Sequence, residues 1–224
     1  MKELFLAICA VTLLATTSAF ARDLSDEAFA KACPSDAAWM SAQKEAKPHA
    51  AEQISNAPLR AEIYKRFDAD QAARNAIIAN PADKSLVANV NRIDQSNLMW
   101  LRQQIQSDGF PSVAEVGHKG IFEIFMLIQH ADRDRALQTK ALKLMEPLVD
   151  SNEVSKMDVA FLTDRILVAE GRPQRYGTQF GTDERGDRTL SPVEDPASLD
   201  KRRASMGLEP ENDYKCRMDF IFGK

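Results

Sequence analysis

Apolar residues recur along this chain at the three- and four-residue spacing of helices, whereas the alternating pattern typical of strands is almost missing. The pattern predicts an all-α protein, organised as a single-domain, bundle-like array of helices. Residues that commonly cap or interrupt helices lie between the apolar stretches, namely Ser35, Asp83, Ser112 and Asn80-Pro81. Beyond Gly171 the regular spacing fades, so residues 172–195 are predicted to form a long irregular loop near the C-terminus.

One predicted helix, around residues 121–128, is apolar almost all round. A helix with this pattern is usually surrounded by other helices, so we expect it to lie at the centre of the array. The other predicted helices run from Ser35 toward Ala46, over residues 59–79, from Asp83 to the stop at Asp108-Gly109, over residues 137–148 and 157–168, and near Ala197. Gly171 is the expected C-cap of the helix over residues 157–168.

Asp164 lies in the middle of the apolar stripe of residues 157–168, so its carboxylate is expected to face the core. A buried ionised carboxylate needs a cation, several hydrogen-bond donors or a proton. Arg165 is its neighbour but is rotated away by 100°, so we expect the partner to come from another segment. Asn97, with Asp94 at its flank, raises the same question in an earlier stripe.

His130 is a further polar residue beside an apolar region. If the helix continues through residues 129–132, His130 and Asp134 are neighbours one turn apart. If the helix breaks there, Asp132 becomes an N-cap, and His130 lies at a helix C-terminus where the dipole favours its charged form. Both geometries place an imidazole near a carboxylate, either as a structural hydrogen bond or as part of a functional site.

Residues 1–21 have the organisation of a secretory signal peptide, with Lys2 near the start, an apolar run over residues 4–15, and Ala19-Phe20-Ala21 before Arg22. The apolar run is shorter than the roughly 20 residues that cross a bilayer, so we predict no membrane span. A periplasmic or secreted location is expected after cleavage near Ala21.

The mature chain is predicted to consist of a helical extension at residues 22–57 and a helical domain at residues 58–224. The full chain has a formal net charge of −4 and a pI of about 5.5. The predicted signal peptide removes one base and one acid, so the mature chain also lacks the basic excess of a nucleic-acid-binding protein. We predict no nucleic-acid partner and no cofactor.

Cys33 and Cys216 remain after cleavage, at opposite ends of the mature chain and in a compartment that permits oxidation. A disulfide between them is the simplest interpretation, and two unpaired buried thiols are the alternative. The chain has neither a CxxC motif nor a zinc-type cysteine cluster. The pair of His130 and Asp132 is a poor metal signal, because catalytic zinc sites usually need three protein ligands, so no metal is predicted.

Several spaced blocks resemble an uncharacterised bacterial family: Gln129-His130-Ala131-Asp132, then Gln138, Asp164-Arg165, Gln174-Arg175-Tyr176-Gly177-Thr178-Gln179, and the stretch from Asp200 to Leu208. The resemblance covers roughly residues 60–214. It implies that the blocks belong to one recurrent arrangement and meet in three dimensions. We expect residues 174–179 to fold over the ends of the helices that carry His130 and Asp164. The resemblance brings no established activity.

Two functions are compatible with these residues. The first is an envelope binding or interaction module for a small polar ligand or a partner protein, with ligand-binding residues Gln129, Gln138, Gln174, Tyr176, Gly177, Thr178 and Gln179. The second is a hydrolase or transferase with His130 as general base, oriented by Asp132 or Asp134, and with Asp164 and Arg165 in the site. We rank the enzyme second, because the sequence has no GxSxG, P-loop or zinc signature. In a third interpretation the polar cluster is purely structural.

Overall fold

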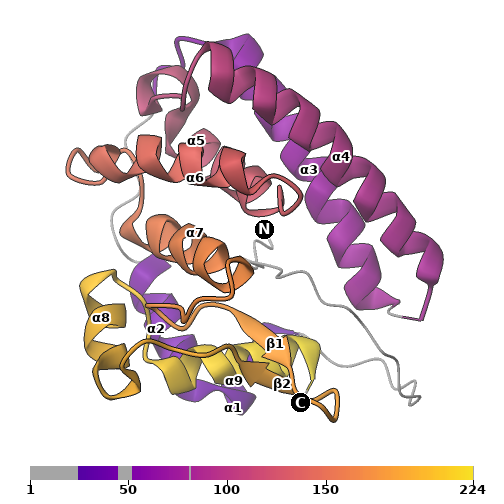
Figure 1. Cartoon of the computed structure of the whole chain (residues 1–224), viewed down its shortest axis with the longest axis vertical. Helices are drawn as coiled ribbons and strands as arrows, with labels where there is room; N and C mark the ends of the chain where they lie inside the picture. The colour runs from indigo at the N-terminus through magenta and orange to yellow at the C-terminus, as the bar shows by residue number, and fades with distance from the viewer. Residues whose placement is uncertain (1–24, 45–51, 81, 224) are drawn as a thin grey trace. The chain divides into compact units, whose positions relative to one another are not determined.

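The computed structural model describes residues 25–44, 52–80 and 82–223, and the predicted signal peptide lies outside these ranges. The described residues form helices α1 to α9, two short 3₁₀ helices and one small hairpin (Figure 1). This confirms the all-α prediction. Within the described ranges, no helix combines the length and the apolar composition needed to cross a bilayer.

The chain divides into two compact units. Among the described residues, unit 1 contains residues 53–162, and unit 2 contains residues 25–44, residue 52 and residues 163–223. The boundary falls inside one helix, α7 (Lys156–Ala169), which therefore belongs in part to each unit.

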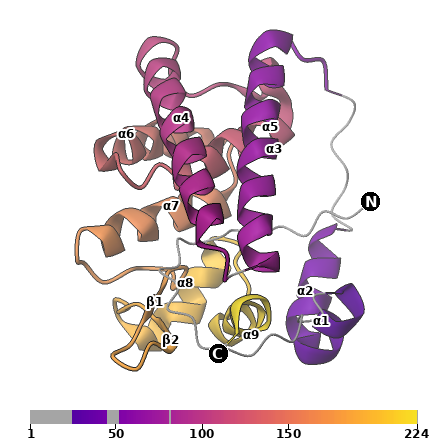
Figure 2. The ribbon, with the colours of Figure 1, turned by 90° about the vertical axis from the view of Figure 1, so that its right-hand side faces the viewer.

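Unit 1 is built on the helices α3 (Ala57–Ala79), α4 (Lys84–Ser107), α5 (Val113–Gln129) and α6 (Arg135–Met145). Helices α3 and α4 lie side by side as a hairpin, and α5 packs along α3 (Figures 1 and 2). A short 3₁₀ helix, Glu146–Leu148, follows α6. The core side chains of this unit are almost fully buried, among them Ile63, Leu101, Ile124 and Ile128.

The starts of these helices follow from side-chain caps that satisfy unpaired backbone N–H groups. Asp83 accepts a hydrogen bond from Ser85 N at the start of α4, as predicted. Ser112 and Glu115 form a capping box at the start of α5, in the place where the sequence predicted a new helix.

Helix α5 contains a kink at Gly117, whose φ of 71° and ψ of 164° are not helical. This backbone region is open to glycine and strained for other residues. The kink is accompanied by a close approach, because a Cβ atom added to Gly120 would lie 2.7 Å from Cβ of Val116. Small residues at both positions thus set the path of the helix that carries His130 at its end.

Unit 2 contains α1 (Asp26–Ala32), α2 (Pro34–Lys44), α8 (Leu199–Ser205), α9 (Glu211–Phe222) and a 3₁₀ helix, Pro196–Ser198. Strands β1 (Phe180–Thr182) and β2 (Arg188–Leu190) pair antiparallel. The prediction that residues 172–195 are irregular is therefore wrong over this hairpin, which is too short to show an alternating pattern in the sequence. Gly171 does end α7, with a φ of 71°.

A disulfide joins Cys33 to Cys216 and confirms the predicted pairing. It connects the α1–α2 segment to α9, and an ion pair reinforces the connection. Arg217 of α9 donates two hydrogen bonds, of 2.7 and 2.6 Å, to the fully buried carboxylate of Asp36. Such a bidentate geometry is the strongest form of this ion pair.

Candidate functional site

His130 lies in unit 1 at the end of α5, as its C-cap residue. The α-helix stops there and α6 is a separate helix, which decides between the two geometries that the sequence left open. The expectation that Asp132 becomes the N-cap is wrong. Asp134 occupies that position, and its carboxylate accepts a hydrogen bond from Leu137 N at 2.9 Å.

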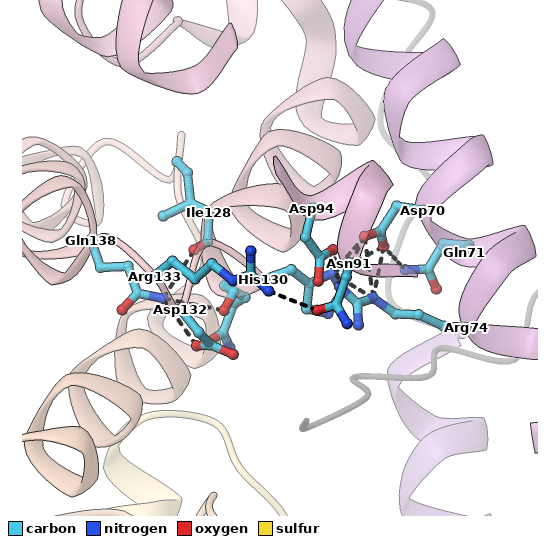
Figure 3. Close-up of polar contacts among 11 residues, drawn as sticks. Asp70, Gln71, Arg74, Asn91, Asp94, Ile128, His130, Asp132, Arg133 and Gln138 are labelled. Atoms are coloured by element: carbon cyan, nitrogen blue, oxygen red, sulfur yellow. Dashed lines mark hydrogen bonds and ion pairs between the residues drawn. The ribbon is translucent and has the colours of Figure 1, made fainter. Parts of the chain in front are cut away.

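The carboxylate that contacts His130 comes from α3 (Figure 3). Nδ1 of His130 lies 2.9 Å from Oδ2 of Asp70, and Nε of Arg74, one turn further along α3, donates to Oδ1 of Asp70 at 3.2 Å. Nη2 of Arg74 also lies 2.5 Å from Oδ1 of Asp94 on α4. We call these four ionisable residues, His130, Asp70, Arg74 and Asp94, the His130 cluster.

These contacts determine where the imidazole carries its proton. Nδ1 of His130 lies within 3.0 Å of both oxygens of Asp70 and 3.0 Å from Nε of Arg74. Nε of Arg74 always carries hydrogen, and Nδ1 cannot donate to Asp70 while it accepts from Arg74. The ionised carboxylate is the stronger acceptor, so His130 and Arg74 both donate to Asp70. In neutral His130 the lone pair then lies on Nε2.

The two acids of the cluster have pKa values shifted in opposite directions. Burial on its own raises the pKa of Asp70, but the His130 imidazole and the Arg74 guanidinium outweigh it and hold this pKa at about 2. Burial raises the pKa of Asp94 to about 6, aided by the charges of Asp70 and Asp132 and opposed by Arg74. Strongly shifted pKa values that gather in one place are typical of functional sites.

The members of the His130 cluster differ in burial. The side chains of Asp70, His130 and Arg74 are 1%, 3% and 7% exposed, whereas that of Asp94 is 21% exposed. Asp94 is thus the member of the cluster with the most solvent access, and it connects to the three buried members through Arg74. Close by, Arg133 donates from Nη2 to Oδ1 of Asn91 at 3.0 Å (Figure 3).

Gln138 fastens α6 to the end of α5. Its Nε2 donates to the backbone oxygens of Ile128 and Gln129, each at 3.2 Å, which belong to the last turn of α5. The same nitrogen lies 3.5 Å from Oδ1 of Asp132. Gln129 itself is buried, and its Oε1 has no hydrogen-bond partner among the described residues.

Asp70 and Arg74 were not singled out from the sequence. The signal that marks them is a series of charges of alternating sign at four-residue spacing along α3, formed by Glu62, Arg66, Asp70 and Arg74. Such a series is typical of a solvated helix face, because neighbours four residues apart form exposed ion pairs. In this helix the second half of the series is buried, a difference that the spacing does not reveal.

Asp164 lies in unit 2 and is fully buried. Its carboxylate accepts hydrogen bonds from the backbone N–H groups of Arg175, Tyr176 and Thr178, at 2.7 to 3.1 Å, and from the hydroxyl of Thr178 at 3.0 Å. Burial raises the pKa of Asp164, and these four donors oppose that effect. The partner of Asp164 therefore comes from the loop after Gly171, as expected.

Geometry explains why residue 177 of this loop is a glycine. Gly177 has a φ of 64°, and a Cβ atom at this position would lie 3.2 Å from Cδ2 of Leu199. Its carbonyl oxygen accepts a hydrogen bond from Nη1 of Arg203, which also donates to the oxygen of Tyr176. Another residue at this position would strain the backbone and crowd Leu199, so glycine suits the loop that wraps around Asp164.

The remaining polar residues of the loop are engaged in contacts within unit 2. Gln174 is fully buried and both accepts from Gln179 N, at 2.8 Å, and donates to the oxygens of Gln179 and Ser191. Arg165 donates to Oε1 of Gln179 at 3.4 Å. The ring of Tyr176 is half-buried. These contacts fasten the loop to its own unit.

The polar blocks are thus distributed over both units. The contacts of His130 and Gln138 described above lie within unit 1, and those of Asp164, Arg165 and residues 174–179 lie within unit 2. No group of three or more His, Cys, Asp or Glu residues in the described ranges is arranged to hold a metal ion.

A family model described as a family of unknown function, DUF6624, matches residues 57–224. The chain belongs to the DUF6624 family. The DUF6624 match includes α3 to α9, and with them both the His130 cluster and the loop around Asp164, while α1 and α2 precede it. No curated protein and no solved structure matches the chain. Membership in this family therefore supplies no activity, and function has to be argued from the site.

Proposed function

We propose that this chain is an exported binding protein that recognises a small polar ligand at the His130 cluster. The observation that carries the proposal is the ionisable network of Asp70, Arg74, Asp94 and His130, which joins three buried groups to a partly exposed carboxylate. A network of this kind is expensive to bury and holds its members in fixed positions. Fixed polar groups at the edge of a core are the usual basis of ligand specificity.

Asp94 is the proposed contact to the ligand. Its raised pKa means that the surroundings do not fully stabilise the ionised carboxylate, although Arg74 lies 2.5 Å away. A ligand that donates hydrogen bonds to this carboxylate would stabilise the charged form. Binding is therefore expected to strengthen as the pH rises from about 5 to about 7, through the pKa of about 6.

A ligand screen at two pH values tests the proposal. The mature chain is heated with a panel of amino acids, amino sugars, polyols and dicarboxylates at pH 5 and pH 7, and the melting temperature is recorded. A compound of the expected class stabilises the protein more at pH 7, because a ligand that binds the native state raises its stability. Asp94→Asn should remove this pH dependence, whereas Asp150→Asn, a change at an exposed acid outside the cluster, should keep it. Stabilisation that is identical in Asp94→Asn would contradict the proposal.

Export belongs to the same proposal. It is supported by the signal-peptide organisation of residues 1–21 and by the Cys33–Cys216 disulfide, since disulfides persist in oxidising compartments. Mass spectrometry of the protein recovered from the envelope fraction should give a chain that starts near Arg22. Recovery of the uncleaved chain from the cytosol would count against export.

A second candidate function is a hydrolase or transferase with His130 as general base. The observation in its favour is the contact between Asp70 and Nδ1, which orients the imidazole and leaves its basic lone pair on Nε2. Asp70 thus takes the orienting role that the sequence had suggested for Asp132 or Asp134.

Nitrophenyl acetate, phosphate and glycosides provide a first assay of the enzyme hypothesis. His130→Gln should abolish turnover while ligand binding at Asp94 is retained, because the two residues have separate tasks in this scheme. Turnover that survives in His130→Gln would remove His130 from the mechanism.

A further inference from the structure

The peptide bond between Asp195 and Pro196 stands out in unit 2. These residues form the only Asp-Pro pair in the sequence, and Pro196 is the first residue of the 3₁₀ helix Pro196–Ser198. The carboxylate of an aspartate can reach its own carbonyl carbon through a five-membered ring. The proline nitrogen belongs to a tertiary amide, which takes a proton more readily than an ordinary peptide nitrogen. The pair is therefore suited to intramolecular cleavage.

The backbone of Asp195 is held in an unfavourable conformation. Its φ of 41° and ψ of 77° are left-handed, and among the described residues only Asn152 also has a positive φ without being glycine. Contacts on both sides hold this geometry, because Glu194 N donates to the oxygen of Gln174 at 2.8 Å and the 3₁₀ helix begins at Pro196. Such strain persists only where the surrounding structure imposes it, and it gathers at functional sites.

The carbonyl oxygen of Asp195 is surrounded by hydrogen-bond donors. Nη1 and Nη2 of Arg202, in α8, each donate to it at 3.1 Å, and Ser198 N donates at 3.2 Å. Arg202 is itself fixed, since its Nε donates to the oxygen of Arg175 at 2.7 Å and its Nη2 also donates to that of Glu194. Negative charge develops on a carbonyl oxygen when a nucleophile adds to its carbon, and fixed, positively charged donors stabilise it. These donors thus form an oxyanion hole around a bond of the chain itself.

The same guanidinium also contacts the carboxylate of Asp195. Oδ2 of Asp195 lies 3.8 Å from Nη1 of Arg202, the atom that donates to the Asp195 carbonyl oxygen. Arg202 therefore keeps the nucleophile and the carbonyl group close together, which replaces the bimolecular attack of ordinary hydrolysis by an intramolecular one. The side chain of Asp195 is 58% exposed, so water has access to the site.

We infer that the Asp195–Pro196 bond is a self-cleavage site. A carboxylate oxygen of Asp195 adds to the residue's own carbonyl carbon and forms a five-membered cyclic anhydride. The bond from this carbon to the Pro196 nitrogen breaks, and the nitrogen takes a proton from the solvent and becomes a new N-terminus. Water then opens the anhydride into the side-chain carboxylate and a new C-terminal carboxylate, which returns a proton to the solvent. The net reaction is hydrolysis of one peptide bond, and Arg202 stabilises the oxyanion on the way.

The disulfide determines how the products behave. Cleavage separates residues 196–224, which include α8 and α9, from the preceding chain, but Cys216 in α9 remains bonded to Cys33. The two pieces therefore stay joined until a reductant breaks the disulfide. Cleaved and intact protein differ by the mass of one water before reduction and separate into fragments after it.

Time courses on the purified mature chain test the inference. The protein is incubated at pH 5 with protease inhibitors, reduced at intervals and analysed by mass spectrometry. We expect a fragment that begins at Pro196, formed with first-order kinetics at a rate that does not depend on protein concentration. A synthetic peptide of residues 190–200, which lacks Arg202, and the chain unfolded in urea should be cleaved about tenfold more slowly or less. Equal rates in the folded chain and the peptide, or no cleavage of the folded chain, would overturn the inference.

Matched variants assign the two roles. Asp195→Glu keeps the charge but requires a six-membered ring, so cleavage should slow about tenfold or more. Arg202→Gln removes the positive charge from the carbonyl oxygen and should slow cleavage about 100-fold, the usual effect of losing an oxyanion-hole donor. Asp187→Glu and Arg185→Gln, the same changes at exposed residues of the β1–β2 turn, should leave the rate unchanged.

The two variants also guard against a loss of folding. Arg202→Gln loses its contact with Arg175, so its native helix content is checked by circular dichroism before its rate is compared. Asp195→Glu changes an exposed side chain and tests the nucleophile separately. Cleavage at the unchanged rate in either folded variant would overturn the inference.

Discussion

At the scale of single residues, the carboxylate of Asp164 holds the loop of residues 175–178 in place. Four donors from residues 175–178 converge on it, so the loop is folded around a charge on its own preceding helix. An apolar side chain in this position would leave three backbone N–H groups buried without acceptors. The cost of unpaired buried groups then falls on the loop as well as on the helix.

Asp164→Ala should lower the free energy of unfolding by about 3 to 5 kcal/mol, the range for removal of one partner from a buried charged contact. Urea unfolding followed by circular dichroism measures the change, with Glu170→Ala at the exposed end of α7 as the control. Formate should restore part of the loss in Asp164→Ala, because it fits the vacated donors. If Asp164→Ala had the same melting temperature as the unchanged protein, the prediction would be wrong.

Asp158 gives a second prediction at this scale. It is buried in α7, has no hydrogen-bond partner in the described ranges, and burial raises its pKa to about 8. The native state therefore holds a proton at Asp158 that the unfolded state releases near pH 4, so stability falls as the pH rises between these values. The slope from one such group approaches 1.4 kcal/mol per pH unit.

Between pH 6 and pH 8 this slope should come mainly from Asp158, because Asp94, with a pKa of about 6, loses most of its proton in the lower part of the window. Asp158→Asn keeps the shape of the protonated acid and should flatten the pH dependence of urea unfolding in this window. Asp150→Asn, an exposed acid, is the matched control. Equal slopes in the unchanged protein and in Asp158→Asn would show that Asp158 is already ionised in the native state.

At the scale of elements, the sequence predicted features that depend on neighbouring residues and missed contacts between different helices. The start of α4 at Asp83 and the loop contact of Asp164 were predictable, because caps, stop signals and stripes act over a few residues. The contact of His130 with Asp70 was not, since periodicity gives the buried face of a helix but not the helix that covers it. Short elements such as α1 and the β1–β2 hairpin carry too few residues for a pattern.

The junction of α5 and α6 allows a test of which acid caps α6. Asp134 caps α6 and also pairs with Arg102 at 2.6 Å, whereas Asp132, two residues earlier, is exposed. Asp134→Ala should therefore cost about 1 kcal/mol more than Asp132→Ala in urea unfolding, the usual value of an N-cap. Equal losses of unfolding free energy in the two variants would contradict the assignment of Asp134 as the N-cap of α6.

At the scale of the whole molecule, the disulfide closes a long loop of sequence that includes unit 1, although neither cysteine belongs to that unit. Cys33 and Cys216 are separated by 183 residues, and the described residues of unit 1 all lie between them in the sequence. Both cysteines belong to unit 2, where the Arg217–Asp36 ion pair makes the same connection between α9 and the α1–α2 segment. A cross-link over so long a loop is worth about 5 kcal/mol in the chain-entropy model, through its effect on the unfolded chain.

Reduction of the disulfide should therefore weaken unit 2 and spare unit 1. Hydrogen exchange of the mature chain, with and without a phosphine reductant, measures this residue by residue, because local opening has its own free energy in each part of a protein. We expect faster exchange in α1, α2 and α9 after reduction and unchanged exchange in α5. A double variant, Cys33→Ser with Cys216→Ser, should reproduce the reduced pattern and be insensitive to the reductant, which controls for side effects of the reagent. If α5 loses as much protection as α9, the two units open as one cooperative structure, and the stability of the His130 cluster depends on a bond outside its own unit.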